Sequence, residues 1–286
     1  LLTHVVSSSS YSLGAGLGDP KSEDVKPGFN SLGYGGVYDT HHVYLPKLSA
    51  DKMSLTIEYD QAIPDWEINA PGPSPVHALV HMAEGKKSLQ NATANRAAKA
   101  KFEKAFYAYD KKLMTAAGKV WSKDYNTNKV DASTNPLLLV GNGAYMLQSA
   151  VPGGSVTLVE NPRHKTNPSG PKTSGIKTIV YRIIGDGTAA AQALRNQEID
   201  VYQGQPTADS VNLLKAIPTA KVIGGNDAVY EHIDLRVGKS KTETTEYTGP
   251  FAGNSQKAKD LRTAFLMAYP RDEIVDKLIK PINATA

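Results

Sequence analysis

Apolar residues recur three or four positions apart between residues 95 and 118, and this spacing predicts a helix. Its buried stripe is expected to comprise Ala98, Phe102, Ala105, Phe106, Tyr109 and Leu113. Gly118 is expected to cap the helix at its C-terminal end. Residues 54–60 alternate apolar and polar positions, which is typical of a half-buried strand. Residues 1–50 are rich in Ser and Gly, which predicts surface loops after one initial helix.

The second half of the chain alternates strand-like and helix-like segments. The pattern predicts strands at residues 155–160, 199–202 and 221–223 and helices at residues 188–196 and 209–217. It also predicts a last pair of helices over residues 257–267 and 271–279, divided by Pro270. We expect residues 177–184, 200–203 and 230–237 to be strands of one sheet. Apolar residues on both faces of 177–184 indicate a sheet covered on both sides. The fold class is therefore expected to be α/β.

The composition narrows the class of protein. Of the 286 residues, 40% are hydrophobic and 21% are charged, as in soluble globular proteins. The net charge of +4 comes from basic residues spread along the chain, without the basic stripe that nucleic-acid binding needs. No cysteine is present, which excludes disulfides and thiolate metal sites. No apolar run approaches the roughly 18 residues of a transmembrane helix.

Motifs for catalysis are weak. His77 and His81 lie four residues apart, but a zinc hydrolase needs Glu after the first histidine, and Ala78 stands there. No Gly-x-Ser-x-Gly nucleophile turn occurs. We therefore expect no catalytic residues, no cofactor, no hydrolytic turnover and no zinc bound by the two histidines. A secreted hydrolase remains the competing hypothesis.

An ordered set of short motifs begins at the middle of the chain. It runs through Gly141-Asn-Gly-Ala-Tyr145, Pro152-Gly153, Val156–Pro162, Ile179–Ile184, an Ala-rich segment from Ala189 to Leu194, Gln197-Glu-Ile-Asp200, Arg262-Thr-Ala-Phe265 and Pro270-Arg-Asp-Glu-Ile-Val275. In this order the set resembles solute-binding protein family 5, the oligopeptide and dipeptide binding proteins of ABC importers. The segments Gln205–Asp209 and Tyr230–Asp234 resemble actinobacterial members most. Asn142 and Ala144 replace the Thr and Pro of the family's turn, Arg163-His164 replaces an aromatic residue, and Gln197 replaces a Gly.

The resemblance implies a periplasmic-binding-protein-like fold (type II, cluster C), present here in incomplete form. Residues 1–134 would form part of a small inserted domain, residues 135–238 the central part of the sheet lobe, and residues 239–286 the start of a second, truncated ligand-binding lobe. Ile274, Val275, Leu278 and Ile279 would then be exposed or covered by another chain. The two lobes of such proteins close around ligand by hinge motion.

The resemblance also implies partners and a location. The partners would be a peptide or small solute and the ABC permease in the membrane, with no nucleic acid. The full-length protein would be an extracytoplasmic lipoprotein, anchored by a lipidated cysteine. A cell-surface binding module that is not coupled to transport is a further alternative. The identity of the ligand stays open, because family members also carry nickel chelates, opines and sugars.

We expect one side of the ligand cleft at Tyr202, Gln203, Gly204, Gln205, Pro206 and Thr207. These residues follow the predicted strand 199–202, and open α/β sheets bind ligands at the carboxyl ends of strands. Glutamine amides and a threonine hydroxyl suit a peptide backbone, and a glycine allows close approach. The alternative is that Thr207 only caps the helix from Ala208, with both glutamines in water.

Overall fold

The computed structural model describes residues 2–18, 28–29, 38, 40–64, 66, 74–164, 175–224, 232–239 and 243–283. The chain divides into two compact units, Leu1–Ile183 and Ile184–Ala286. This division differs from the domain limits expected after residues 134 and 238, which stay a prediction. Within the described ranges, no helix has the length and apolar character needed to cross a membrane.

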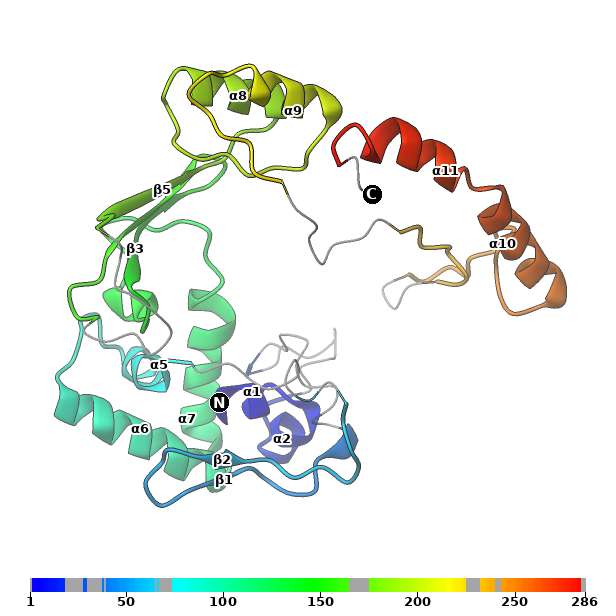
Figure 1. Cartoon of the computed structure of the whole chain (residues 1–286). Coiled ribbons are helices and arrows are strands. Elements are labelled where there is room, and N and C mark those ends of the chain that lie inside the picture. The colour runs from blue at the N-terminus through cyan, green and yellow to red at the C-terminus, as the bar shows by residue number, and fades with distance from the viewer. Residues whose placement is uncertain are drawn as a thin grey trace. The chain divides into compact units, whose positions relative to one another are not determined.

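A cluster of helices forms the core of the first unit (Figure 1). Its members are α1 (Leu2–Val6), α2 (Ser9–Gly14), α5 (Val76–Ala83), α6 (Ala92–Tyr107) and α7 (Lys111–Lys119), which continues as the π-helix η1 (Val120–Asp124). The largest side chains buried between them are Tyr11, Phe29, Leu79, Phe102, Phe106 and Met114. Tyr11 stacks on Phe106 at 4.6 Å between ring centroids, and its hydroxyl donates to the Phe106 carbonyl at 2.7 Å.

The serine-rich start of the chain is helical and largely buried, so the prediction of surface loops is wrong for this segment. Ser7 and Ser8 lie between α1 and α2, Ser12 lies within α2, and all three are at most 1% exposed. The Ser8 hydroxyl donates to the Val5 carbonyl at 2.6 Å, and the Ser12 hydroxyl donates to the Val6 carbonyl at 2.5 Å. A buried hydroxyl is stable when it is hydrogen-bonded, and here the carbonyls of the helix end provide the acceptors.

The helix predicted over residues 95–118 is present as two helices. The chain leaves α6 at Tyr109, which has φ +50, and Asp110 then caps α7 by accepting from the Leu113 amide at 3.1 Å. Aspartate favours such cap positions because its carboxylate competes for backbone N–H groups. All of the predicted stripe is buried except Tyr109, whose side chain is 39% exposed.

Gly118 does not cap a helix, and that prediction is wrong. The helical path continues through it into η1, and the residue is buried. A Cβ at Gly118 would lie 1.9 Å from the carbonyl oxygen of Gly28, so the glycine permits a close approach of two backbones. Such a contact, between residues far apart in the sequence, leaves no local pattern.

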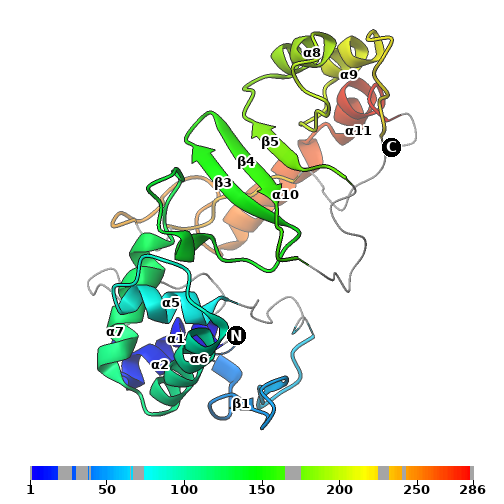
Figure 2. The same ribbon diagram turned by 90° about the vertical axis from the view of Figure 1, so that its left-hand side faces the viewer.

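Two small antiparallel sheets complete the first unit. One pairs β1 (Lys47–Leu48) with β2 (Leu55–Thr56), so the strand predicted over residues 54–60 is shorter than expected. The other has the order β3–β4–β5, with β3 (Tyr145–Val151), β4 (Ser155–Glu160) and β5 (Thr178–Arg182) lying side by side (Figure 2). A short 3₁₀ helix, η2 (Pro136–Leu139), precedes β3. The strands predicted at residues 155–160 and 177–184 are confirmed as β4 and β5.

Strand β5 is not covered on both faces, which corrects the prediction made from its apolar run. Val180, Tyr181 and Ile183 are 54%, 59% and 64% exposed. An apolar run shows that a strand can be buried, but it does not show which other part of a protein would bury it.

In the second unit, two short helices follow one another as predicted. They are α8 (Gly187–Arg195) and α9 (Ala208–Lys215), which contact each other. Residues 200–203, 221–223 and 232–237 have no regular secondary structure, so the strands predicted there are wrong; residues 230 and 231 lie outside the described ranges. Strands exist only when a neighbour accepts and donates their hydrogen bonds, and a short apolar segment does not specify that neighbour.

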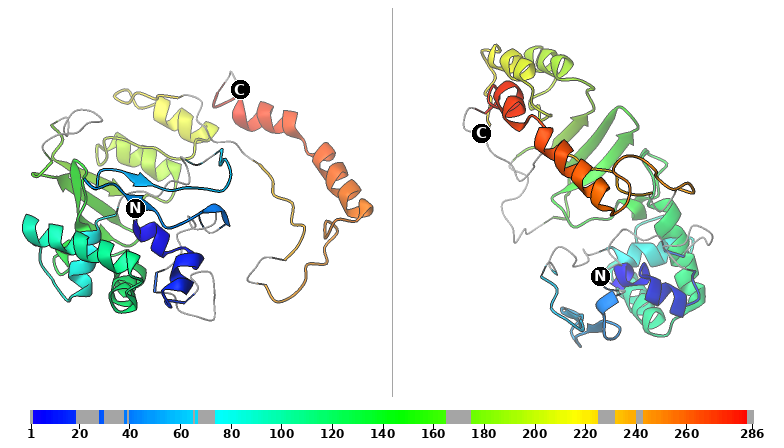
Figure 3. Two further views of the ribbon diagram at one scale, coloured as in Figure 1. Left: turned by 90° about the horizontal axis from the view of Figure 1, so that it is seen from below. Right: turned by 90° about the vertical axis from the view of Figure 1, so that its right-hand side faces the viewer.

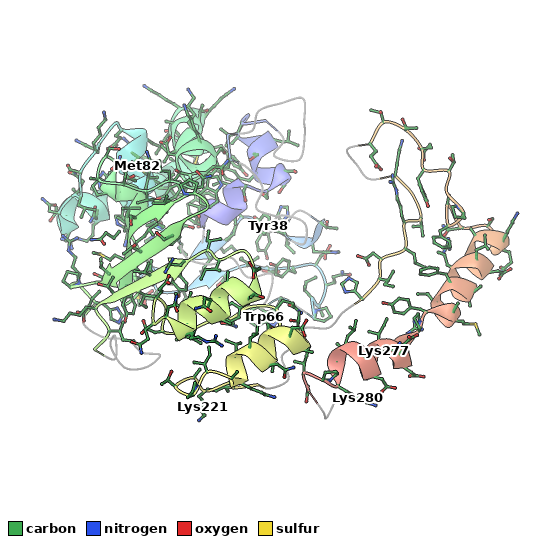
Figure 4. The ribbon with its side chains drawn as sticks, turned by 90° about the horizontal axis from the view of Figure 1, so that it is seen from above. Tyr38, Trp66, Met82, Lys221, Lys277 and Lys280 are labelled. Carbon is green, nitrogen blue, oxygen red and sulfur yellow. The ribbon has the colours of Figure 1, made fainter. Side chains whose placement is uncertain are left out.

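The last helices match the prediction and are separated at Pro270 (Figure 3). They are α10 (Gln256–Ala268) and α11 (Arg271–Ile274), which continues as the π-helix η3 (Val275–Ile279). Leu278 is 60% exposed, and Ile274, Val275 and Ile279 are partly exposed. Figure 4 shows Lys277 and Lys280 on this last segment, where their ammonium groups pair with Glu273 and Asp276 one turn earlier.

Candidate functional site

The predicted ligand-binding loop lies between α8 and α9. Helix α8 begins after Asp186, whose carboxylate accepts from the amides of Thr188 and Ala189 at 2.8 and 2.9 Å. It ends at Asn196, and Gln197 follows with φ +60, a conformation that favours glycine. The glycine that the resemblance implies at this position would suit this backbone conformation, and this chain has a glutamine there.

Tyr202 packs against its own loop. A Cβ at Gly204 would lie 2.2 Å from the Tyr202 hydroxyl oxygen, so the tyrosine ring occupies the space above that glycine. The same hydroxyl lies near the start of α8, at 3.5 Å from the position of a Cβ at Gly187. The open space at Gly204 that was expected to admit a ligand is thus filled by Tyr202, and a ligand would reach it only after the ring turns away.

Thr207 has a structural role. Its hydroxyl accepts from the Ser210 amide at 3.1 Å, and the Ser210 hydroxyl accepts from the Thr207 amide at 2.9 Å. This reciprocal pair is a capping box for α9. The alternative stated for Thr207, that it caps the helix from Ala208, is therefore confirmed.

Two glutamines and Thr207 are the exposed polar residues of the loop, and Thr207 is already engaged in the capping box. Gln203 and Gln205 are exposed, as are Gly204 and Pro206 between and after them. Neither amide forms a hydrogen bond with any residue that the structure describes. Each therefore offers a donor and an acceptor to a ligand. Whether the loop faces a ligand in the protein remains a prediction.

A second polar surface in the same unit was not predicted. The Arg236 guanidinium pairs with Glu243 at 2.6 Å and lies over the Tyr247 ring at 4.6 Å from its centroid. Lys239 pairs with Glu246 at 2.7 Å. An open hollow of about 530 Å³ lies here, lined by Arg236, Glu243, Glu246, Tyr247, Gly249 and three threonines; Lys239 is not part of its lining.

A sequence signal for this surface exists. Tyr247-Thr-Gly249 repeats the spacing of Tyr202-Gln-Gly204, and in both segments the tyrosine ring lies over the glycine two residues later. At Gly249 a Cβ would lie 1.9 Å from the Tyr247 hydroxyl oxygen. The Tyr-x-Gly pattern occurs a third time at Tyr34-Gly-Gly36, which lies outside the described residues, and the two described loops share the same local packing.

The two histidines of α5 face the helix cluster of the first unit. The His81 ring is 4% exposed, and its Nε2 lies 3.1 Å from Oδ1 of Asn95. Its other nitrogen lies 4.0 Å from a Glu84 carboxylate oxygen, and Glu84 also pairs with Lys101 at 2.7 Å. The described residues contain no group of three or more His, Cys, Asp or Glu placed to hold a metal ion.

His77 is expected to make the first unit sensitive to acid. Burial lowers its pKa in the folded protein, and the charges of Lys99 and His81 lower it further. The unfolded chain, with a pKa of about 6.5, therefore binds more protons as the pH falls through that value, and folding stability drops. In His77→Gln the melting temperature should fall less than in the wild type between about pH 7.5 and about pH 5.5.

Thermal unfolding at each pH, followed by tryptophan fluorescence, measures this difference. His232→Gln, an exposed histidine of the second unit, is the matched control and should behave as the wild type. Equal pH dependence of His77→Gln and the wild type would contradict the effect assigned to His77.

Comparison with known proteins identifies the family. The family model described as bacterial extracellular solute-binding proteins, family 5 Middle, matches residues 68–285. The chain belongs to this family. Family 5 proteins are extracellular solute-binding components of ABC importers, and their fold is periplasmic-binding-protein-like. Searches among curated proteins and among solved structures gave no match.

Membership of family 5 agrees with the helices and small sheets of the structure. It assigns the protein to the extracytoplasmic side of the membrane, with a solute as ligand and an ABC permease as partner. Proteins of family 5 generally bind solutes without transforming them.

Proposed function

We propose that the protein captures oligopeptides, or a small solute of similar chemistry, between two lobes and delivers them to the permease of an ABC importer. The family match over residues 68–285 is the observation that carries this proposal. In the full-length protein, a lipidated cysteine would hold the binding lobes close to the permease.

The loop 202–207 is the part of the chain that we assign to ligand contact. Gln203 and Gln205 lie on an exposed loop, and their amides bond to none of the residues that the structure describes. Pro206 restricts the backbone between them and α9. A restricted loop loses less conformational freedom when a ligand binds. Thr207 contributes by fixing the loop to α9, while Tyr202 would have to leave Gly204 for a peptide main chain to approach.

Replacing both glutamines should weaken ligand binding. We expect Gln203→Ala with Gln205→Ala to raise the Kd roughly tenfold, because two hydrogen bonds of about 0.5–1.5 kcal/mol each would be lost. The ligand is first identified by mass spectrometry of small molecules that copurify with the protein. Calorimetric titration of the stripped protein with that ligand then gives the Kd of each variant.

A second double variant controls for the general effect of replacing two exposed glutamines by alanine. Gln192 and Gln256 are exposed glutamines on α8 and α10. The Gln192 amide donates to Asn196, the C-cap residue of α8, at 2.9 Å, and the Gln256 amide donates to Asp260 of α10 at 2.8 Å. Gln192→Ala with Gln256→Ala should leave the Kd unchanged. Wild-type affinity in the loop variant would remove residues 202–207 from the binding site without contradicting solute capture.

Two other functions are separable from this one. A cell-surface module without transport would bind the same solute but would not bind its permease, which a pull-down with the purified permease detects. A secreted hydrolase would turn over generic ester or peptide substrates. Turnover that survives further purification would overturn the assignment to solute capture.

A further inference from the structure

We propose that Asn142 is a site of spontaneous deamidation and isoaspartate formation in the folded protein. Asn142–Gly143 is the single Asn-Gly step of the sequence. It lies in the turn before β3, where this chain has Asn142 in place of the threonine of the family's turn. Both residues are exposed, so water and base reach them.

The reacting groups are not held by other interactions. Neither the Asn142 carboxamide nor the Gly143 amide hydrogen bonds to any residue in the described part of the chain. The turn itself is fixed from the next residues onward. The Asn161 side-chain amide donates to the Gly143 carbonyl at 2.9 Å, and the Asn161 backbone amide donates to the Ala144 carbonyl at 2.8 Å. The Asn142 carboxamide and the Gly143 amide can therefore approach each other, while the residues that follow them are held in place.

The chemistry needs only water. The Gly143 backbone nitrogen, after losing its proton to base, attacks Cγ of Asn142 and forms a new N–C bond. The bond from Cγ to Nδ2 breaks, and the amide leaves as ammonia after taking up a proton. Water then opens the resulting succinimide at either carbonyl, which gives aspartate or isoaspartate at position 142. Glycine favours this closure because it has no Cβ to restrict the backbone or obstruct the attacking nitrogen.

The products differ from the native turn. Either product adds one negative charge beside the sheet. Isoaspartate also lengthens the main chain by a methylene between Asn142 and Gly143, next to the carbonyl that Asn161 binds. Because Asn161 is only 8% exposed, its amide depends on that carbonyl for a hydrogen bond. The aged protein should therefore contain molecules with two different turns before β3.

The rest of the chain provides matched comparisons. Asn128 is also exposed, but Lys129 follows it, and the Lys129 amide donates to the Thr127 hydroxyl at 3.3 Å. Asn135 and Asn161 precede prolines, which have no N–H to attack. A Cβ at Gly143 would meet only the Tyr145 backbone, at 3.6 Å, so Gly143→Ala fits the fold.

The test is incubation of the folded protein for days at mildly alkaline pH, with peptide mapping by mass spectrometry and enzymatic methylation to detect isoaspartate. Deamidation at Asn142 should be about tenfold or more faster than at Asn128, and Gly143→Ala should slow it about tenfold. Asn142→Gln should abolish the isoaspartate signal. The same incubation in urea reports the rate of the unfolded chain.

Two results would overturn the proposal. One is a rate at Asn142 that equals the rate at Asn128. The other is a rate in the folded protein below roughly one tenth of the rate in urea, because the native turn would then protect the step. Neither result depends on the identity of the ligand.

Discussion

Replacing Phe106 by alanine is expected to destabilise the first unit by about 3–5 kcal/mol. The Phe106 ring is fully buried. It stacks on the Tyr11 ring at 4.6 Å between centroids and meets the Tyr107 ring edge-on at 5.0 Å between centroids. Removing it leaves a cavity between α2 and α6 in addition to the lost apolar burial. The hydrogen bond from the Tyr11 hydroxyl goes to the Phe106 backbone carbonyl, so the substitution leaves that acceptor in place.

Urea unfolding measures this loss through the fluorescence of Trp121, which packs beside Phe29 at 5.8 Å in the same unit. Met53→Ala is the control, because the Met53 side chain is 83% exposed and its removal should change the stability by no more than about 0.5 kcal/mol. A loss at Phe106 similar to that of Met53→Ala would show that the Phe106 ring does not belong to the core.

Gly118→Ala is expected to destabilise the same unit by about 2–3 kcal/mol. The added Cβ would stand 1.9 Å from the Gly28 carbonyl oxygen and 2.8 Å from the Gly28 Cα, both backbone atoms that cannot move aside alone. The two backbones would have to separate, and the buried contacts of Phe29 with Trp121 would separate with them. Gly118→Val should cost more, because its side chain is larger.

Whether Gly118→Ala destabilises or stabilises the unit tests the close approach of Gly28 directly. In a helix without this contact, glycine to alanine stabilises by about 1 kcal/mol. Stabilisation of that size would therefore contradict the close approach of Gly28. Gly141→Ala is the matched control: a Cβ there meets nothing within 4 Å, and its stability should remain within about 0.5 kcal/mol of the wild type.

The local sequence predicted the helix that follows the candidate loop, but it did not predict how the side chains pack within the loop. The helix start at Ala208 and the exposed glutamines follow from the local sequence, and Thr207 caps α9 as the alternative interpretation stated. The position of the Tyr202 ring over Gly204 did not follow, because a side-chain direction depends on the path of the loop. At the Arg236 surface, the Tyr-x-Gly spacing at Tyr247 marks the loop in the sequence, but it does not show the ion pairs that surround it.

The sequence by itself determined α6, α8, α9 and α10 and several of their ends. Side chains one turn apart share a face, so the spacing of Ala98, Phe102, Ala105 and Phe106 predicted the buried stripe of α6. Asp186 and Thr207 start helices by binding backbone amides two or three residues away, and Pro270 separates α10 from α11. These effects act within a few residues, and a linear sequence displays them.

The tertiary structure alone decided the contacts between distant segments. The approach of Gly28 to Gly118, the burial of Ser7, Ser8 and Ser12, and the exposure of β5 each depend on which other segment arrives at that place. The strands predicted at residues 200–203 and 230–237 show the same limit over their described residues, because the partner of a strand is determined by the fold of the whole unit. Periodicity reports which face of an element is apolar, and the packed structure determines what covers it.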